Sequence, residues 1–217
     1  MQQIHIPYYA NGLKTVDIFT NELDHNIKYS INCNPWNYEF SGEADVAMAY
    51  TDAGILLKFN VIEENIMARF TKTNDPVYRD SCVEFFIALD NEFAYYNFEF
   101  NCTGTCLAGY GTSADDRQLL STKKIDQIEI RSSFKSLLFK EKEMVNWQLT
   151  LLIPNQVFQF HKIDSFNGRE AKVNFYKCGD DLPKPHYLCW NPIMNTAQPN
   201  FHLPDYFGKA IFLKKLA

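Results

Sequence analysis

The sequence lacks the local signals of a chain that crosses a membrane or is exported through one. No apolar run reaches the roughly 20 residues that a bilayer-spanning helix needs. The segment Met1–Pro7 has neither the basic stretch nor the apolar stretch of a secretory signal peptide. We therefore expect a cytoplasmic protein with no membrane partner.

Clusters of basic residues are also missing. The chain has 21 Lys and Arg against 26 Asp and Glu, a formal net charge of −5, and the basic residues form no block. Nucleic-acid binding depends on neutralising phosphates with gathered Lys and Arg side chains. The charge pattern therefore argues against nucleic acid as the main partner.

The motifs of nucleophilic, nucleotide and metal chemistry are absent as well. There is no G-x-S-x-G, P-loop, G-x-G-x-x-G or H-E-x-x-H, and no C-x-x-C pair among the six cysteines. The spacing of Cys102 and Cys106, and that of Cys178 and Cys189 with His186 between them, are weak zinc patterns. Buried free thiols in a reduced protein are the preferred interpretation.

Aromatic residues, in contrast, are abundant. They make up 15% of the 217 residues, with 18 Phe and 12 Tyr, and aromatic side chains suit the half-buried surfaces of sheets. Short alternating segments follow one another with turn signals at roughly 8–12-residue spacing. This pattern predicts an all-β fold, an antiparallel β-sandwich of the immunoglobulin or jelly-roll kind with two sheets, long loops and little helix.

Because no repeat or linker interrupts the chain, we expect one domain over residues 1–217. The expected elements are a short helix over 16–23 and strands over 28–32, 46–50, 55–62, 80–89, 95–102, 128–132, 145–153, 171–177 and 210–213.

The most informative stretch is the pair of predicted strands 80–89 and 95–102, whose short connection suits a hairpin. One pairing places every apolar side chain on one face and brings Glu84 opposite Glu99 on the other. Like charges directly opposite each other destabilise a sheet. A cation, a basic side chain, a shared proton or a polar ligand is therefore expected beside them. The same face carries the polar residues Asp80, Asn97 and Asn101.

Paired carboxylates raise the possibility of glycoside hydrolysis. Asp80 and Glu84 lie four residues apart on one strand, roughly 13 Å at about 3.3 Å per residue, which exceeds the separations of about 5–9.5 Å that hydrolysis uses. Glu84 and Glu99 are close enough, but nothing in the sequence makes one an acid and the other a base. A structural or ligand-contacting pair is preferred. The alternative, a glycoside hydrolase or accessory enzyme that uses Glu84 and Glu99, stays open.

Aromatic residues in the loops suggest a sugar site. An aromatic ring covers the C–H face of a sugar, and polar side chains bind its hydroxyl rim. The segments Tyr78–Asp80 and Tyr187–Asn191 hold this mixture, and the second lies in a proline-rich stretch, 178–207, whose length is typical of a functional loop. Equally, Trp36 and Trp190 would serve as plugs at the ends of the sandwich.

Four segments in order resemble the family-9 carbohydrate-binding modules, in the divergent form found as stand-alone proteins in gut Bacteroidetes. They are the YRDSCVEFF run at 78–86, the FEFN run at 98–101 with Gly104 after it, the core strand at 147–154, and the tail from 172 through HYLCWNP at 186–192 to 211. The resemblance covers roughly residues 28–213, nearly the whole chain.

The resemblance implies a β-sandwich that binds carbohydrate without cleaving it, in polysaccharide or oligosaccharide utilisation, with a separate glycoside hydrolase as a partner. Members appended to xylanases hold a sugar end between two Trp rings and contain structural calcium. By resemblance, Tyr78 and Trp190 form the stacking pair, although Tyr78 replaces a Trp. A scaffold whose sugar site has decayed is a third interpretation. The implied polar partners of the ligand are Arg79, Glu84, Glu99, Asn101, Tyr187 and Asn191, and the implied calcium ligands are Asp80, Glu84 and Glu99.

Overall fold

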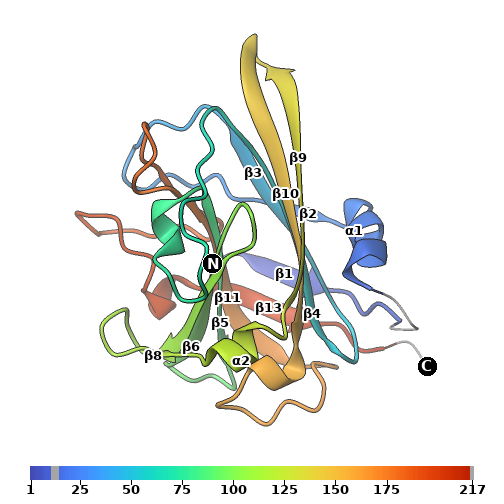
Figure 1. Ribbon diagram of the computed structural model, residues 1–217. Coiled ribbons are helices and arrows are strands. Elements are labelled where there is room, and N and C mark those ends of the chain that lie inside the picture. The colour runs from blue at the N-terminus through green and yellow to red at the C-terminus, as the bar shows by residue number, and fades with distance from the viewer. Residues whose placement is uncertain (11–14, 216–217) are drawn as a thin grey trace.

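Two β-sheets pack face to face in the computed structural model, which describes residues 1–10 and 15–215 (Figure 1). The larger sheet contains, in spatial order, β1 (Gln3–Ile6), β13 (Gly208–Phe212), β11 (Glu170–Cys178), β5 (Cys82–Leu89), β6 (Tyr95–Asn101), β7 (Cys106–Gly111) and β8 (Gln118–Leu119), and β12 (Tyr187–Cys189) pairs with β11 off this path. The smaller sheet contains β2 (Lys28–Ser30), β3 (Glu43–Tyr50), β4 (Gly54–Glu63), β10 (Lys142–Pro154) and β9 (Glu129–Phe139). The predicted all-β sandwich is confirmed.

Helical structure is sparse, as predicted. The short elements are α1 (Val16–Asp24), α2 (Thr122–Ile125) and the 3-10 turns η1 (Val77–Arg79), η2 (Asn155–Val157) and η3 (Pro204–Tyr206). The helix α1 lies on the outer side of the smaller sheet, where Phe19 and Leu23 pack against Ala49 and Leu56 (Figure 1). Among the described residues, no helix has the length and apolar character needed to span a bilayer.

The sandwich core forms because alternating residues of both sheets point inward. Phe85 stacks on Phe175 with 5.5 Å between ring centroids, and Phe59 from the smaller sheet meets Phe175 edge-on. Trp147, at the middle of β10, is fully buried in the same core. The period-two pattern of the strands therefore places Phe85, Phe59 and Trp147 between the sheets.

The outer face of the larger sheet differs from the expectation that it is only polar. Every residue of β5 and β6 is buried, so these two strands are covered on both faces of the sheet. A second apolar cluster on the outer face includes Phe86, Tyr95, Tyr176 and Phe207. The long segment between β11 and β13 folds back over this face (orange to red in Figure 1). The acidic pair thus lies beneath loops rather than at an open surface.

An ion pair joins the two sheets inside the sandwich. Lys177 of β11 places its ammonium 3.0 Å from a Glu63 carboxylate oxygen of β4, and both side chains are buried. Glu63 also accepts a 2.6 Å hydrogen bond from the Trp147 indole, and the Lys177 ammonium lies 2.7 Å from His186. Because burial and the adjacent Lys177 charge disfavour its cationic form, the pKa of His186 falls to about 3. His186 is therefore neutral, and Glu63 balances the lysine.

We expect Glu63→Gln to lower the free energy of unfolding by about 3–5 kcal/mol, because it leaves the Lys177 charge buried without its counterion. The double variant Glu63→Gln/Lys177→Met removes both charges and should recover part of that loss. Urea unfolding of the two variants measures the difference.

The matched control is Glu64→Ala, because the partly exposed Glu64 pairs only loosely with Lys184, at 3.4 Å. Its loss should cost no more than about 1 kcal/mol. Equal losses of stability in Glu63→Gln and in the double variant would contradict this account. They would show that Glu63 does not stabilise the fold by balancing the charge of Lys177.

Candidate functional site

The predicted pairing of the central hairpin is confirmed, and it places two carboxylates side by side. Glu84 of β5 lies directly opposite Glu99 of β6, and their side chains are 3% and 2% exposed. Both project to the outer face, because Phe85 and Phe98 on the neighbouring positions fill the core. Directly opposed side chains on a sheet are within contact distance, so the charge of Glu99 acts on Glu84.

The environments of the two carboxylates are unequal. Glu99 accepts a 2.8 Å hydrogen bond from Arg117 and a 2.9 Å hydrogen bond from the Asn97 side chain. Burial raises the pKa of Glu99, and the Arg117 charge opposes this shift. Within residues 1–10 and 15–215, the one hydrogen bond that Glu84 receives comes from the Cys178 thiol, at 3.1 Å. Burial and the Glu99 charge raise the pKa of Glu84 well above its usual value. Glu84 is therefore the carboxyl group that holds a proton more readily.

These carboxylates line a cavity of about 330 Å³ on the outer face of the larger sheet. Glu84, Glu99, Cys178 and Tyr187 come from its strands, Tyr78 comes from η1, and loops supply the rest. This volume falls in the range of about 300–1,000 Å³ that is typical of small-molecule sites. The loop residues around the cavity are Ala114, Arg117, Asp180, Pro199, Asn200, Phe201 and His202.

Aromatic rings form part of the cavity wall. Phe201 stacks on Tyr176 with centroids 4.2 Å apart and planes 13° from parallel. Tyr187 is half-buried and is held edge-on by Trp36 and Tyr38. These contacts fix the rings before any ligand arrives, which lowers the entropic cost of binding.

Two further polar groups complete the wall. Burial raises the pKa of Asp180 to about 6, while a hydrogen bond from Tyr187 opposes the shift. Burial and the Arg117 charge lower the pKa of His202 to about 3, so the imidazole is neutral. Since a guanidinium only donates, His202 Nε2 is the acceptor toward Arg117 at 3.5 Å. The other ring nitrogen, Nδ1, then donates to Tyr95 at 2.8 Å.

Trp190 does not join Tyr78 at the cavity. It is 2% exposed and packs between the sheets, edge-on to Phe175. Gly208 leaves room for its ring, since a Cβ there would come within 2.4 Å of Trp190 Cζ3. The predicted stacking pair is therefore wrong for Trp190, because β12 turns this side chain inward. The alternative that it fills the sandwich is what the structure shows.

Three other predicted polar residues hold the scaffold instead of lining the cavity. The Asn101 side chain donates to Phe70 and Asp80, and Asn191 accepts from Gln2 and donates to Tyr206. Arg79 is exposed and pairs with Asp181 at 2.8 Å. Of the predicted ligand contacts, the cavity therefore gathers Tyr78, Glu84, Glu99 and Tyr187.

The three predicted calcium ligands do not converge. Asp80 accepts hydrogen bonds from the Phe70 amide and the Asn101 side chain, away from the carboxylate pair. Among the described residues, the one group of three ligand side chains whose donor atoms lie mutually close is Cys82, Glu84 and Cys178. Calcium prefers oxygen ligands. The set that does converge offers two sulfur ligands, which calcium does not prefer. The predicted set of Asp80, Glu84 and Glu99 does not form one calcium site, because Asp80 does not lie with the other two.

Sequence reasoning missed Arg117, Asp180, Phe201 and His202. The need for a basic partner beside Glu84 and Glu99 was visible in the hairpin, but which of the chain's basic residues would supply it was not. The proline-rich stretch 178–207 does supply Asp180, Phe201 and His202. The unusual length of this loop indicated a functional segment, but it did not indicate which residues of the segment reach the site.

The packed sheets and this cavity define a β-sandwich binding domain. The chain belongs to carbohydrate-binding family 9, which it matches over residues 17–212. This confirms the family indicated by the hairpin and tail motifs.

Solved structures agree with this assignment. A Bacteroides uniformis protein provisionally assigned to carbohydrate binding is 30% identical, with a TM-score of 0.88 over 97% of this chain and 99% of its own. A family-9 module from Caldicellulosiruptor kristjanssonii in complex with glucose shares the fold at 13% identity, with a TM-score of 0.57 over 100% of this chain and 97% of its own. The corresponding cellotriose complex has 13% identity and a TM-score of 0.56, over 100% and 95%. No curated protein is significantly similar to this chain.

The titration of Asp180 predicts a pH effect on stability. Its pKa of about 6 in the folded protein exceeds the ordinary 3.8, so the folded state takes up a proton first as the pH falls. Asp180 therefore weakens the fold as the pH rises from about 4 to 6. We expect Asp180→Asn to gain stability relative to the parent across this window, measured by urea unfolding.

The neighbouring Asp181→Asn provides a control of opposite sign. Hydrogen bonds from Arg69 and Arg79 lower the pKa of Asp181, so its carboxylate stabilises the fold above its ordinary pKa. Asp181→Asn should lose stability relative to the parent as the pH rises. A difference for Asp180→Asn that stays constant between pH 4 and 6 would contradict the assignment.

Proposed function

We propose that this protein binds a monosaccharide or the end of an oligosaccharide in the cavity over Glu84 and Glu99, without cleaving it. The observation that carries the proposal is the composition of the cavity. Rings from Tyr78, Tyr187 and Phe201 stand beside three carboxyl groups and one guanidinium. Apolar walls with a few placed polar groups are typical of small-molecule sites.

The chemistry of a sugar matches this arrangement. Its hydroxyl groups both donate and accept, so Glu99 and Asp180 can accept from the rim while Arg117 donates. Its C–H face packs against aromatic rings. Family membership supports a carbohydrate ligand. The glucose and cellotriose complexes of the Caldicellulosiruptor module support a gluco-configured one. We extend the proposal to a role in saccharide utilisation beside a separate glycoside hydrolase.

The predicted position of the slot changes in this proposal. The sequence led us to expect an aromatic-lined slot at the loop end of the sandwich. The cavity proposed here has strand residues from β5, β6 and β11 at its base, and loops close over it. A rigid sheet holds the carboxylates in place, which suits a preformed site.

One observation bears on the alternative of a glycoside hydrolase. Glu84 and Glu99 have unequal partners, which is the asymmetry that an acid and a base need. However, directly opposed side chains on adjacent strands meet a ligand from the same side. Hydrolysis requires the two carboxyl groups to flank the scissile bond. The geometry therefore favours binding alone.

We expect Tyr187→Ala to weaken binding of glucose and cello-oligosaccharides by about tenfold or more, because losing about 1.4 kcal/mol of ring contact has that effect. Isothermal titration calorimetry with glucose, cellotriose and xylose measures it. Phe134→Ala is the matched control, since Phe134 is an exposed aromatic on a strand of the other sheet. Equal affinities of Tyr187→Ala and the parent would rule out this cavity.

We expect no turnover of a panel of aryl glycosides by the parent protein. The assay includes Glu84→Gln, which keeps the size of the side chain and removes its titration. Activity in the parent that disappears in a folded Glu84→Gln would overturn the non-catalytic assignment and establish the hydrolase.

A further inference from the structure

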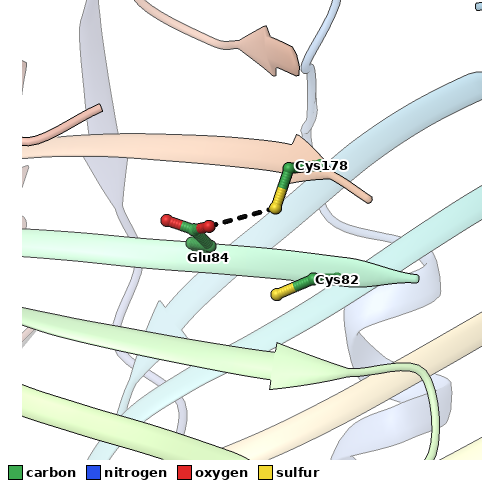
Figure 2. Close-up of side chains that lie close together, drawn as sticks. All are labelled: Cys82, Glu84 and Cys178. Carbon is green, nitrogen blue, oxygen red and sulfur yellow. Dashed lines mark hydrogen bonds between the residues drawn. The ribbon is translucent and has the colours of Figure 1, made fainter. Parts of the chain in front are cut away.

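Two cysteines and one glutamate lie close together on the outer face of the larger sheet (Figure 2). Two of the three, Glu84 and Cys178, line the cavity. Cys82 and Glu84 are two residues apart on β5, so their side chains share the outer face. Cys178 of β11 lies directly opposite Cys82 in the sheet. Strand pairing between segments almost 100 residues apart thus gathers three side chains that the sequence does not place together.

The distances suit coordination of one ion. The two Sγ atoms and a Glu84 carboxylate oxygen all lie within 4.8 Å of one another. Ligands on a tetrahedral zinc ion, with bonds of about 2.0–2.3 Å, stand about 3.3–3.8 Å apart. The Cys178 Sγ to Glu84 Oε1 distance is already 3.1 Å, along the hydrogen bond drawn in Figure 2. Small side-chain rotations would bring the third ligand, Cys82, to the same centre.

The charges around Glu84 leave a place for a cation. Arg117 binds Glu99, and no Lys or Arg among residues 1–10 and 15–215 lies within ion-pair distance of Glu84. Glu84 is nonetheless 3% exposed and faces Glu99 across the strands. Opposed buried carboxylates need compensation, and a divalent ion on Glu84 would supply it.

The site also has an entry path and an open position. Glu84 and Cys178 line the cavity, whereas Cys82 is fully buried beside them. An ion entering through the cavity would meet these three ligands on one side and the cavity on the other. Three protein ligands with a free fourth position are typical of zinc sites that bind a further molecule, rather than of closed structural sites.

We propose that Cys82, Glu84 and Cys178 bind a thiophilic divalent cation of the zinc class. Two thiolates select such an ion over calcium or magnesium. Binding replaces the protons of the two thiols and the proton held by Glu84, which are released to solvent, so the affinity falls as the pH falls. The inference is independent of sugar binding, because it uses only protein ligands and the free ion.

The test is a Co²⁺ titration of the reduced full-length chain, followed by back-titration with Zn²⁺. Reduction matters because an oxidant could join the neighbouring thiols of Cys82 and Cys178. We expect one Co²⁺ per chain with thiolate-to-cobalt charge-transfer absorption, displaced by Zn²⁺ and not by Ca²⁺. Cys82→Ser and Cys178→Ser should each weaken Zn²⁺ binding by at least about tenfold, the lower end of the loss seen on removing even a supporting residue of a zinc site.

Cys106→Ser is the matched control, since Cys106 is a buried free thiol in the core between the sheets. It should bind as the parent does. Glu84→Gln keeps the test decisive if a cysteine variant fails to fold, because it removes one ligand and leaves both thiols. Absence of the charge-transfer band, or a band unchanged in the folded Cys82, Glu84 and Cys178 variants, would overturn the proposal. Neither result affects the carbohydrate proposal, because no sugar is present.

Discussion

The opposition of Glu84 and Glu99 on a buried sheet face is the constraint on which the site depends. Two carboxyl groups that face each other away from bulk water cannot both ionise without compensation. The protein answers with an unequal arrangement in which Arg117 and Asn97 bind Glu99, while Glu84 keeps the thiol of Cys178. A carboxylate pair whose burial would otherwise cost stability lies at the base of a cavity.

Loops cover the outer face of the larger sheet, and the same loops supply most of the other residues of the cavity. Asp180, Tyr187, Phe201 and His202 all belong to the segment that follows β11. That segment is anchored by apolar contacts on the outer face, where Phe207 packs against Phe86. Burial of the aromatic cluster and formation of the cavity therefore depend on the same fold-back of the chain.

The fold is retained in a distant family-9 module at 13% identity, while a much closer relative shares 30%. A sandwich tolerates such divergence because its strands need only alternate apolar and polar positions and close their hydrogen bonds. The particular side chains over the outer face are freer to change. Here that face carries two thiols beside the carboxylates, a chemistry that an oxygen-only calcium site would not use.

The sequence by itself determined the sandwich architecture, the pairing of Glu84 with Glu99 and the family, because side chains alternate along a strand and this hairpin pairing gathers Val83, Phe85, Ile87, Tyr96, Phe98 and Phe100 on one face. Tertiary structure alone decided which side chains reach the cavity. Trp190 turns inward against Gly208, Arg117 arrives from a polar loop, and Cys178 meets Cys82 across paired strands. The alternation of apolar and polar residues along a strand is a local property of the sequence. The packing of loops on the sheet depends on contacts between residues far apart in the chain, which no short sequence pattern predicts.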